Sequence, residues 1–216
     1  MKPRHRARMV GFMCEALHKL DCSSQTFFRA VDLLDMYFEA APDGVPQCEL
    51  HLLGIACMLI ASKYEDRYPL PIDVLRCKVA HSAYSVVDIL KMELDVLATL
   101  QFRVGARPTL FELAERLVQQ RFPLSADNLQ PFVETLARTA CFDHSLLERN
   151  SREALAEAIV KHSSDSYRQI NGHESDETPV EDENIAGLAA ALEKLYMNFP
   201  RRFPLLPEVY RLLGLF

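Results

Sequence analysis

The stretch LHLLGIACMLIASK, from Leu50 to Lys63, constrains the fold more than any other part of the sequence. Its first twelve residues carry no formal charge when His51 is neutral, and they are apolar on every side of a helical wheel. A bilayer-spanning helix needs about 20 apolar residues, whereas this run is followed directly by Ser62 and Lys63. The sequence therefore predicts a central helix that other helices cover, and no membrane association.

The composition favours an all-α protein. Apolar residues make up 49% of the chain, which is ample for a core, and the seven glycines form no GxG pattern typical of a phosphate loop. Apolar residues recur at helical spacing in ten segments, at about 6–20, 25–40, 50–63, 72–79, 86–100, 111–118, 129–140, 152–170, 185–199 and 207–213. Two units of five helices, residues 1–106 and 107–216, fit this pattern.

Within these units, the helix at 152–170 takes the place in the second half that the central helix takes in the first. Ser85 and Ser125 each precede an apolar helical pattern, so we predict that both are helix N-caps. The prolines at 69 and 71 prevent the central helix from continuing. Each unit is therefore expected to enclose one central buried helix.

The six cysteines are scattered without CxxC spacing and fall mostly within apolar helical patterns. That usage is typical of reduced core cysteines in an intracellular compartment. Cys48, His51 and Cys57 lie near one another in the sequence, but their spacing fits no zinc pattern. We therefore expect no metal and no other cofactor. The sequence also has no Ser-His-Asp setting, HExxH motif or P-loop, so intrinsic catalysis is not expected.

Charge argues against a nucleic-acid partner. The net charge is −6, divided as −1 over residues 1–106 and −5 over 107–216, so no general phosphate-binding surface is expected. The basic start, residues 1–8, lacks the apolar run of a secretory signal and reads as a solvated helix lead-in or a short nuclear address. Residues 174–183 hold six acidic side chains and no basic one. They read as a solvated loop, with a site for a basic partner as the alternative.

Lys63 and Glu93 interrupt two apolar helical surfaces, and burying either charge alone costs several kcal/mol, on the order of an unpaired buried ion. The two side chains should therefore lie close together. One interpretation is an internal ion pair that fixes how two helices pack. The other is a half-covered pair at the rim of the core with hydrogen-bonding capacity left for a partner. Two aromatic residues favour the second interpretation, a docking site: Tyr64 follows Lys63, and Phe102 lies at the end of the helix that carries Glu93.

The segments FFRAVDLLDMYF, LHLLGIACMLIASKYEDRYP and AYSVVDILKMELDVLATLQFRVGARPTLFEL together resemble the cyclin box of the A/B-type mitotic cyclins, over about residues 5–120. The resemblance implies two tandem five-helix cyclin-fold repeats. It also implies a non-catalytic subunit that binds and activates a cyclin-dependent serine/threonine kinase and controls the cell cycle, including mitosis and cell division, in the nucleus and cytoplasm.

Five positions that the family keeps in its box are present, as Arg6, Asp35, Leu52, Lys63 and Glu93. By resemblance, Lys63 and Glu93 would hydrogen-bond backbone groups near the mobile helix of the kinase. Tyr64 and Phe102 would pack against the same helix. Arg6 and Asp35 would pair inside the box and, with Leu52, have a structural role.

Cyclins of this type also carry a substrate-docking patch on their first helix, which takes protein substrates or inhibitors bearing Arg-x-Leu motifs. By resemblance, the patch is formed here by Met9, Phe12, Glu15 and His51. Phe12 stands where the family has a tryptophan and His51 where it has a glutamine, so the groove is only partly reproduced. Two alternatives keep the fold and change the function: a transcription-type cyclin, or a transcription factor with the cyclin fold that binds duplex DNA, for which the acidic charge is unsuited.

Overall fold

The computed structural model describes residues 3–41, 45–171 and 182–215. These residues form helices and connecting turns, with no β-strand in the described ranges, so the all-α prediction is confirmed. By their internal contacts the residues divide into two compact units, Met1–Arg107 and Pro108–Phe216. No helix in the described part of the chain is long and apolar enough to cross a membrane. The basic start is described only from residue 3, and of the acidic stretch 174–183 only the last two residues are described.

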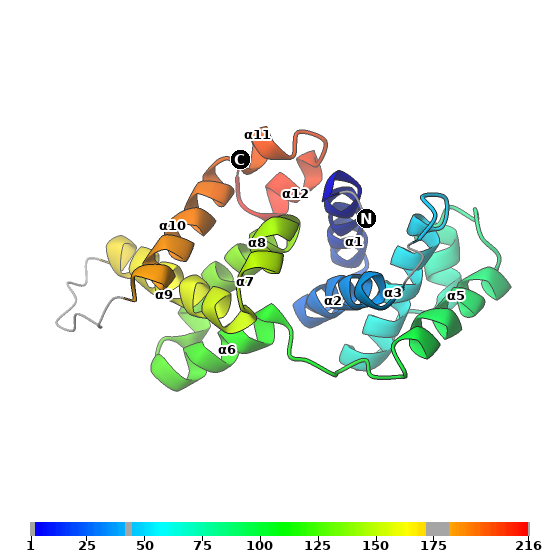
Figure 1. Ribbon diagram of the computed structural model, residues 1–216, viewed down its shortest axis with the longest axis horizontal. Helices are drawn as coiled ribbons and strands as arrows, with labels where there is room; N and C mark the ends of the chain where they lie inside the picture. The colour runs from blue at the N-terminus through cyan, green and yellow to red at the C-terminus, as the bar shows by residue number, and fades with distance from the viewer. Residues whose placement is uncertain (1–2, 42–44, 172–181, 216) are drawn as a thin grey trace. The chain divides into compact units, whose positions relative to one another are not determined.

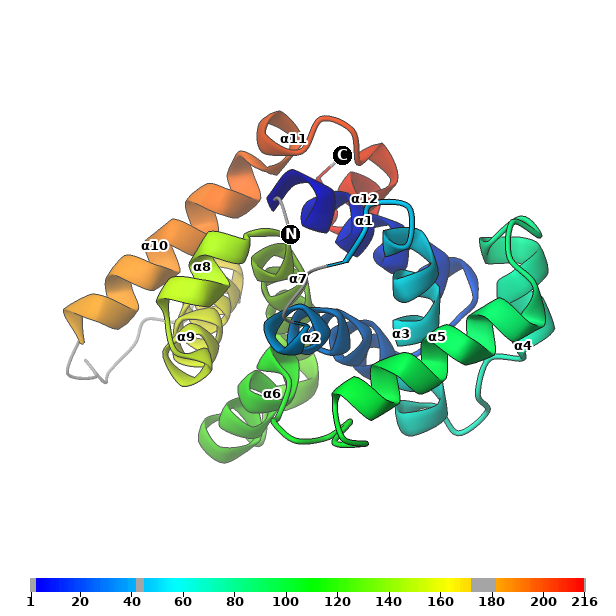
Figure 2. The ribbon, with the colours of Figure 1, turned by 45° about the vertical axis from the view of Figure 1, so that its right-hand side comes forward.

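The first unit is built around α3, Leu50–Glu65, as Figures 1 and 2 show. The helices that surround it are α1 (Pro3–Lys19), α2 (Ser24–Ala40), α4 (Ile72–Val74), η1 (Leu75–Val79) and α5 (Val86–Thr99). Of these, α1, α2, η1 and α5 contact α3 directly. Every residue of α3 from Leu53 to Ser62 is buried. The predicted central helix is therefore confirmed, and its apolar surface is covered all round.

Side-chain hydrogen bonds fix where the helices of the first unit begin and end. Ser23 caps α2 by accepting a hydrogen bond from the Thr26 amide at 3.2 Å. Asp66, which follows α3, accepts hydrogen bonds from the Ser23 amide and the Thr26 hydroxyl. The Ser62 hydroxyl accepts one from the Leu70 amide at 2.7 Å. These bonds fold the segment after α3 back along the helix and tie it to the start of α2.

The helix predicted at 72–79 is present, but its geometry changes within it. After one turn of α-helix it becomes the π-helix η1, which ends where the Ala80 amide donates to the Leu75 carbonyl at 2.8 Å. His81 and Ser82 then adopt left-handed backbone angles, with φ of 47° and 60°. That conformation is uncommon for residues other than glycine, and histidine is one of the residues enriched in it.

The second unit is organised around α9, Arg152–Asn171, which contacts α6 (Leu110–Arg121), α7 (Ala126–Phe142) and α10 (Glu183–Met197). The central place predicted for the helix at 152–170 is therefore confirmed. The helix predicted at 207–213 is α12, Pro207–Leu212, and α8 (His144–Arg149) and α11 (Phe199–Arg202) were not predicted. Phe142, Phe199, Phe203 and Tyr210 form one aromatic cluster at the carboxyl end of this unit.

Two sequence interpretations need correction. Ser125 is not a side-chain cap of α7: it lies at φ −117° and ψ 8°, and its hydroxyl makes no capping hydrogen bond. The cysteines are also less uniformly buried than their apolar surroundings indicate. Cys14, Cys57 and Cys141 are in the core, whereas Cys22 is partly exposed and Cys48 and Cys77 are exposed. Cys48 lies in the turn before α3, and Cys77 lies on η1.

An ion pair joins α1 to α2. Arg6 is 1% exposed, and it donates from Nε and Nη2 to the two carboxylate oxygens of Asp35, each at 2.7 Å. The pairing predicted from the resemblance is therefore confirmed. Because two parallel bonds fix both planar groups, this pair sets the position of α1 against α2. Leu52, the third residue given a structural role, is only partly buried on α3.

We expect Asp35→Ala to lower the free energy of unfolding by about 3–5 kcal/mol, because it leaves the buried Arg6 guanidinium without its carboxylate. Glu39→Ala is the matched control on the same helix. Its ion pair with Arg107 is exposed, so its loss should cost less than about 1 kcal/mol. Urea unfolding measures both values. Equal losses in the two variants would contradict the structural role of the Arg6–Asp35 pair.

The caps provide a second comparison. Ser85 accepts a hydrogen bond from the Asp88 amide, and Asp88 accepts one from the Ser85 amide, so the cap predicted for α5 is confirmed as a capping box. Ser85→Ala should therefore lower the free energy of unfolding by about 1 kcal/mol. Ser125→Ala, which removes no capping bond, should change it by a few tenths at most, on the order of an ordinary surface substitution. A larger loss at Ser125 than at Ser85, measured by thermal or urea unfolding, would overturn this assignment.

Candidate protein-docking site

The Lys63–Glu93 pair predicted from the sequence is present. Lys63, in the last turn of α3, donates from Nζ to Oε1 of Glu93 on α5 at 2.6 Å. Its side chain is 48% exposed, whereas that of Glu93 is 11% exposed. The pair therefore combines features of both interpretations: the carboxylate is buried, as in an internal ion pair, and the ammonium group reaches the surface, where a partner could meet it.

Hydrogen-bonding capacity remains on both partners. An ammonium group carries three donors, and Lys63 uses one of them on Glu93. Oε2 of Glu93 accepts no hydrogen bond from the residues that the structure describes. This oxygen is not one of the enclosed side-chain atoms that lack a partner, so solvent reaches it and it can accept a hydrogen bond from another molecule.

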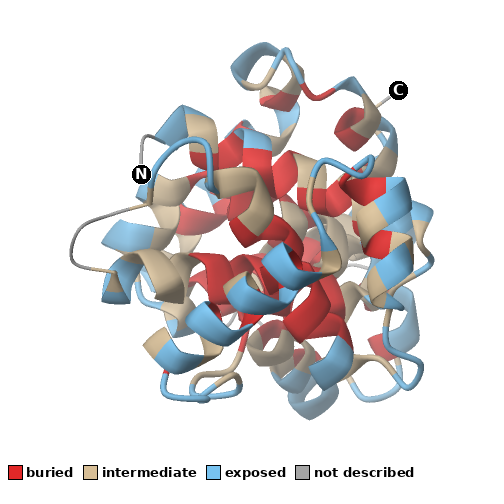
Figure 3. Ribbon diagram, turned by 90° about the vertical axis from the view of Figure 1, so that its right-hand side faces the viewer, coloured by how far each residue is buried: buried red, intermediate tan, exposed pale blue. Residues whose placement is uncertain are grey.

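An exposed apolar face borders the pair on α5. At helical spacing, Glu93 lies between the buried stripe of Ile89, Val96 and Leu100 and a second stripe that is exposed. The exposed stripe consists of Val87, Leu90 and Leu94, with exposed fractions of 57%, 45% and 60%. Figure 3, which faces the side of the first unit on which α5 lies, shows exposed turns in front of buried ones.

The apolar pattern of α5 did not distinguish Leu90 and Leu94 from the buried positions of the helix. Among the described helices, α5 has apolar residues on more than half of its circumference and packs mainly against α3 and α2. Periodicity reports which positions are apolar. It does not report which of two adjacent apolar stripes has a neighbour.

Tyr64 and Phe102, which the sequence assigned to the same surface, are 55% and 65% exposed. We call these two residues, together with Lys63, Glu93 and Leu94, the docking face. A face with aromatic anchors around a partly desolvated charge pair has the composition of a protein interface.

Arg29 on α2 holds the docking face in place, and sequence reasoning missed it. It is 3% exposed, its guanidinium carbon lies 5.2 Å from the centre of the Tyr64 ring, and its Nε donates to Glu65 at 2.7 Å. Its Nη1 donates to the backbone carbonyl of Arg107 at 3.0 Å, which ties down the segment that follows α5. The sequence held no clear signal for it, because at helical spacing Arg29 lies on the side of α2 opposite the apolar stripe of Phe27, Val31 and Leu34.

The turn after α5 directs Phe102 outward. Gln101 and Phe102 have φ of 52° and 57°, and the Phe102 amide donates to the Leu97 carbonyl at 2.7 Å, which closes the helix end. Further along this segment, Gly105 lies against the hydroxyl of Tyr64 so closely that a Cβ atom there would overlap it. The two aromatic residues of the docking face are therefore both positioned by the segment 101–107.

A second surface contains the residues assigned to substrate docking. The rings of Phe12 on α1 and His51 on α3 lie 4.7 Å apart, and Tyr84 lies 5.7 Å beyond His51. Phe12, Glu15 and His51 are partly exposed. Met9 is 7% exposed and packs against Gly54, where a Cβ atom would overlap its sulfur. Met9 therefore lies largely covered beneath this surface, and its part in substrate docking stays a prediction.

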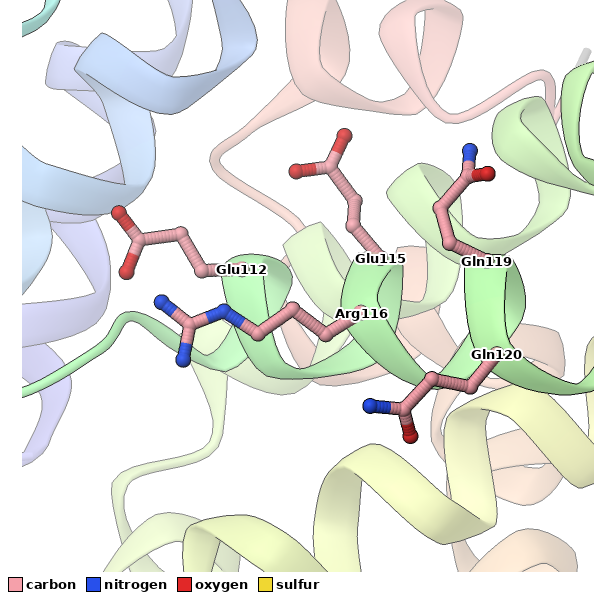
Figure 4. A pocket seen from close by; sticks show the side chains of 5 residues that line it. All are labelled: Glu112, Glu115, Arg116, Gln119 and Gln120. Atoms are coloured by element: carbon pink, nitrogen blue, oxygen red, sulfur yellow. The ribbon is translucent and has the colours of Figure 1, made fainter.

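Among the residues that the structure describes, no group of three or more His, Cys, Asp or Glu side chains could hold a metal ion. A hollow of about 510 Å³ runs along α6 and is lined by charged and amide side chains of that helix (Figure 4). Two of them have structural partners, because Glu112 closes the capping box with Thr109 and Glu115 bonds Gln130.

His51 makes the stability of the first unit dependent on pH. Burial lowers the pKa of His51 below its usual value, and the nearby charge of His81 lowers it further. Below about pH 6.5, the ordinary histidine pKa, the unfolded chain therefore binds a proton that the folded chain resists. This contribution is fully present above that pH and is lost as the pH falls.

We expect His51→Gln to lose less stability than the unsubstituted chain when the pH falls from about 7.5 to 5.5. His18→Gln, which changes an exposed histidine of α1, is the control and should keep the original pH dependence. Thermal unfolding at a series of pH values measures the difference. An unchanged pH dependence in His51→Gln would show that His51 is not the group responsible.

Comparison with known proteins gives the family of the chain. Residues 1–105 match the family described as "Cyclin, N-terminal domain". Cyclin-A3-2 of Arabidopsis thaliana is 30% identical over 149 residues, 68% of this chain and 39% of that protein. Cyclin-B1-1 of Arabidopsis thaliana is 26% identical over 165 residues, 76% of this chain and 37% of that protein. The chain thus spans about two fifths of the length of these two relatives.

The fold is also similar to that of a solved structure. The X-ray structure of a viral cyclin from herpesvirus saimiri aligns with 90% of this chain and 85% of its own, with a TM-score of 0.73 and 13% sequence identity. At that identity the likeness establishes the fold alone, and it extends over both units. Because the N-terminal cyclin domain matches the first unit and the relatives are A-type and B-type cyclins, the chain belongs to the cyclin family and is of the A/B type.

Proposed function

We propose that this chain is a regulatory subunit that binds and activates a cyclin-dependent serine/threonine kinase and has no catalytic activity of its own. The observation that carries the proposal is the docking face: the half-exposed ammonium of Lys63 bonds the buried Glu93, and Tyr64 and Leu94, the next residues in the chain, are exposed, as is Phe102 after α5. Family membership supports a cyclin-dependent kinase as the partner.

The chemistry of the face suits a helix whose backbone groups are accessible at one end. Lys63 would donate one of its remaining hydrogens to a backbone carbonyl, and Oε2 of Glu93 would accept from a backbone amide. Tyr64, Leu94 and Phe102 would cover the apolar side of the same helix, each contributing about 1.5–3 kcal/mol if fully buried. Contacts of this kind fix orientation through the charges and supply affinity through the apolar anchors.

The mechanism is a population shift in the kinase. By the family resemblance, the free kinase holds its regulatory helix swung out, so that the glutamate that must pair with the phosphate-binding lysine is misplaced. A rigid surface that binds the inward position better than the outward one shifts the equilibrium toward the active state. Arg29 and the closed turn after α5 are suited to this role, because they keep the docking face from adapting to the inactive position.

The wider role follows from the same resemblance. The A-type and B-type relatives support control of the cell cycle, acting in the nucleus and cytoplasm, more than they support a transcription-type cyclin. A cyclin-fold factor bound to duplex DNA is not favoured, because the chain has a net charge of −6. Substrates or inhibitors would dock on the surface around Phe12 and His51.

Reversal of the charge at Lys63 tests the proposal. Lys63→Glu should weaken kinase binding by about 2 kcal/mol or more, because it places two carboxylates side by side and removes the donor. It should also abolish activation, measured as phosphate transfer to a short Ser-Pro peptide by a purified monomeric kinase. Circular dichroism should show nearly unchanged helical content, since Lys63 is half exposed.

The matched control is Lys91→Glu, the same charge reversal on an exposed lysine of α5 two residues before Glu93 and on a different face of the helix. It should bind and activate the kinase almost as well as the unsubstituted chain. Equal effects of the two reversals, or loss of folding in Lys63→Glu alone, would reject the docking face in favour of a purely internal ion pair.

A further inference from the structure

A cavity of about 400 Å³ lies beside Phe12, between α1 and η1. Its apolar lining consists of Phe12, Ala16, Leu20 and Val79, and its polar lining of Glu15, Lys19, Lys78 and His81. This volume falls within the range of ligand-binding clefts, about 300–1,000 Å³. The Phe12 ring contacts His51 and also lines this cavity. The cavity is therefore continuous with the substrate-docking surface around Phe12 and His51.

The charges around the cavity differ from those expected of a site that binds a basic docking peptide. Lys19 comes from α1 and Lys78 from η1, both are exposed, and neither forms an ion pair with a described residue. His81 adds a third nitrogen-bearing side chain, presented by a residue in the left-handed conformation. Glu15 is the only acidic residue of the lining, and it already interacts within the chain.

We propose that this cavity binds a docking segment of protein substrates or inhibitors in which an apolar side chain is flanked by acidic residues. The apolar side chain would enter between Phe12, Ala16 and Val79. The carboxylates would lie at the rim, between the ammonium groups of Lys19 and Lys78. The proposal rests on the proposed function and narrows its substrate class, because docking sites of the family are expected from the resemblance to meet a basic residue instead.

The two lysines are expected to contribute more to the specificity of docking than to its affinity. The lysines are exposed, so each contact with a carboxylate is screened by salt and contributes modestly. Two like charges on opposite sides of one cavity nevertheless disfavour an incoming lysine or arginine, and the combined effect on selectivity exceeds that of either contact. The apolar side chain supplies the remaining free energy by burial.

The test uses direct binding to the purified chain, without kinase. Two fluorescein-labelled synthetic peptides are compared by anisotropy, one with two leucines followed by two glutamates and one with the glutamates replaced by lysines. We expect the acidic peptide to bind at least about fivefold more tightly than the basic one at low salt, and this preference to fall as salt increases.

The double variant Lys19→Glu/Lys78→Glu should invert this preference. Phe12→Ala should weaken both peptides, and Lys91→Glu is the matched control that should change neither.

The proposal is overturned if neither peptide binds, if the basic peptide binds as well as the acidic one, or if the double charge reversal leaves the preference unchanged. Kinase activity on substrates with and without the acidic segment distinguishes failure of the docking proposal from failure of the proposed function. If the chain activates a kinase on a short peptide that lacks a docking segment, but substrates with the acidic segment gain no advantage, only the docking proposal fails. Absence of activation on both substrates, with selective binding of the acidic peptide intact, would reject the proposed function alone.

Discussion

The complete covering of α3 is the constraint on which the rest of the first unit depends. Because its residues from Leu53 to Ser62 are buried on every side, α1, α2, η1 and α5 must all pack against it. The charges that this arrangement brings into the core have to be matched, since unpaired buried charge is among the costliest features of a fold. Ion pairs do this: Arg29–Glu65 joins α2 to α3, Arg6–Asp35 joins α1 to α2, and Lys63–Glu93 joins α3 to α5.

The Arg6–Asp35 and Lys63–Glu93 pairs differ in geometry, and the difference indicates a structural role for the first and a binding role for the second. In the Arg6–Asp35 pair both carboxylate oxygens accept bonds from a buried guanidinium, so the pair has a purely internal geometry. In the Lys63–Glu93 pair a single bond is formed, the ammonium group reaches the surface, and exposed apolar side chains stand beside it. An incompletely used pair at the edge of an apolar face is suited to a partner that completes it.

The sequence was sufficient to predict the central helix from its apolar spacing, the Lys63–Glu93 pair from the cost of isolated charge and the cap at Ser85 from N-cap chemistry. The Arg6–Asp35 pair was expected only from the family resemblance. It did not predict that Leu90 and Leu94 are exposed or that Met9 is buried, since those outcomes depend on which helix lies opposite. Arg29 was missed for a related reason. Its partners Tyr64, Glu65 and the Arg107 carbonyl are distant in the chain, so only the fold brings them together.

The most direct test of the docking face is hydroxyl-radical footprinting of this chain, read by mass spectrometry, with and without a bound monomeric cyclin-dependent kinase. Tyr64 and Phe102 are 55% and 65% exposed in the free chain, and Met197 in the second unit is 66% exposed. Strong protection of Tyr64 and Phe102 with little change at Met197 is the predicted result. Kinase binding that leaves the oxidation of Tyr64 and Phe102 unchanged would contradict the account.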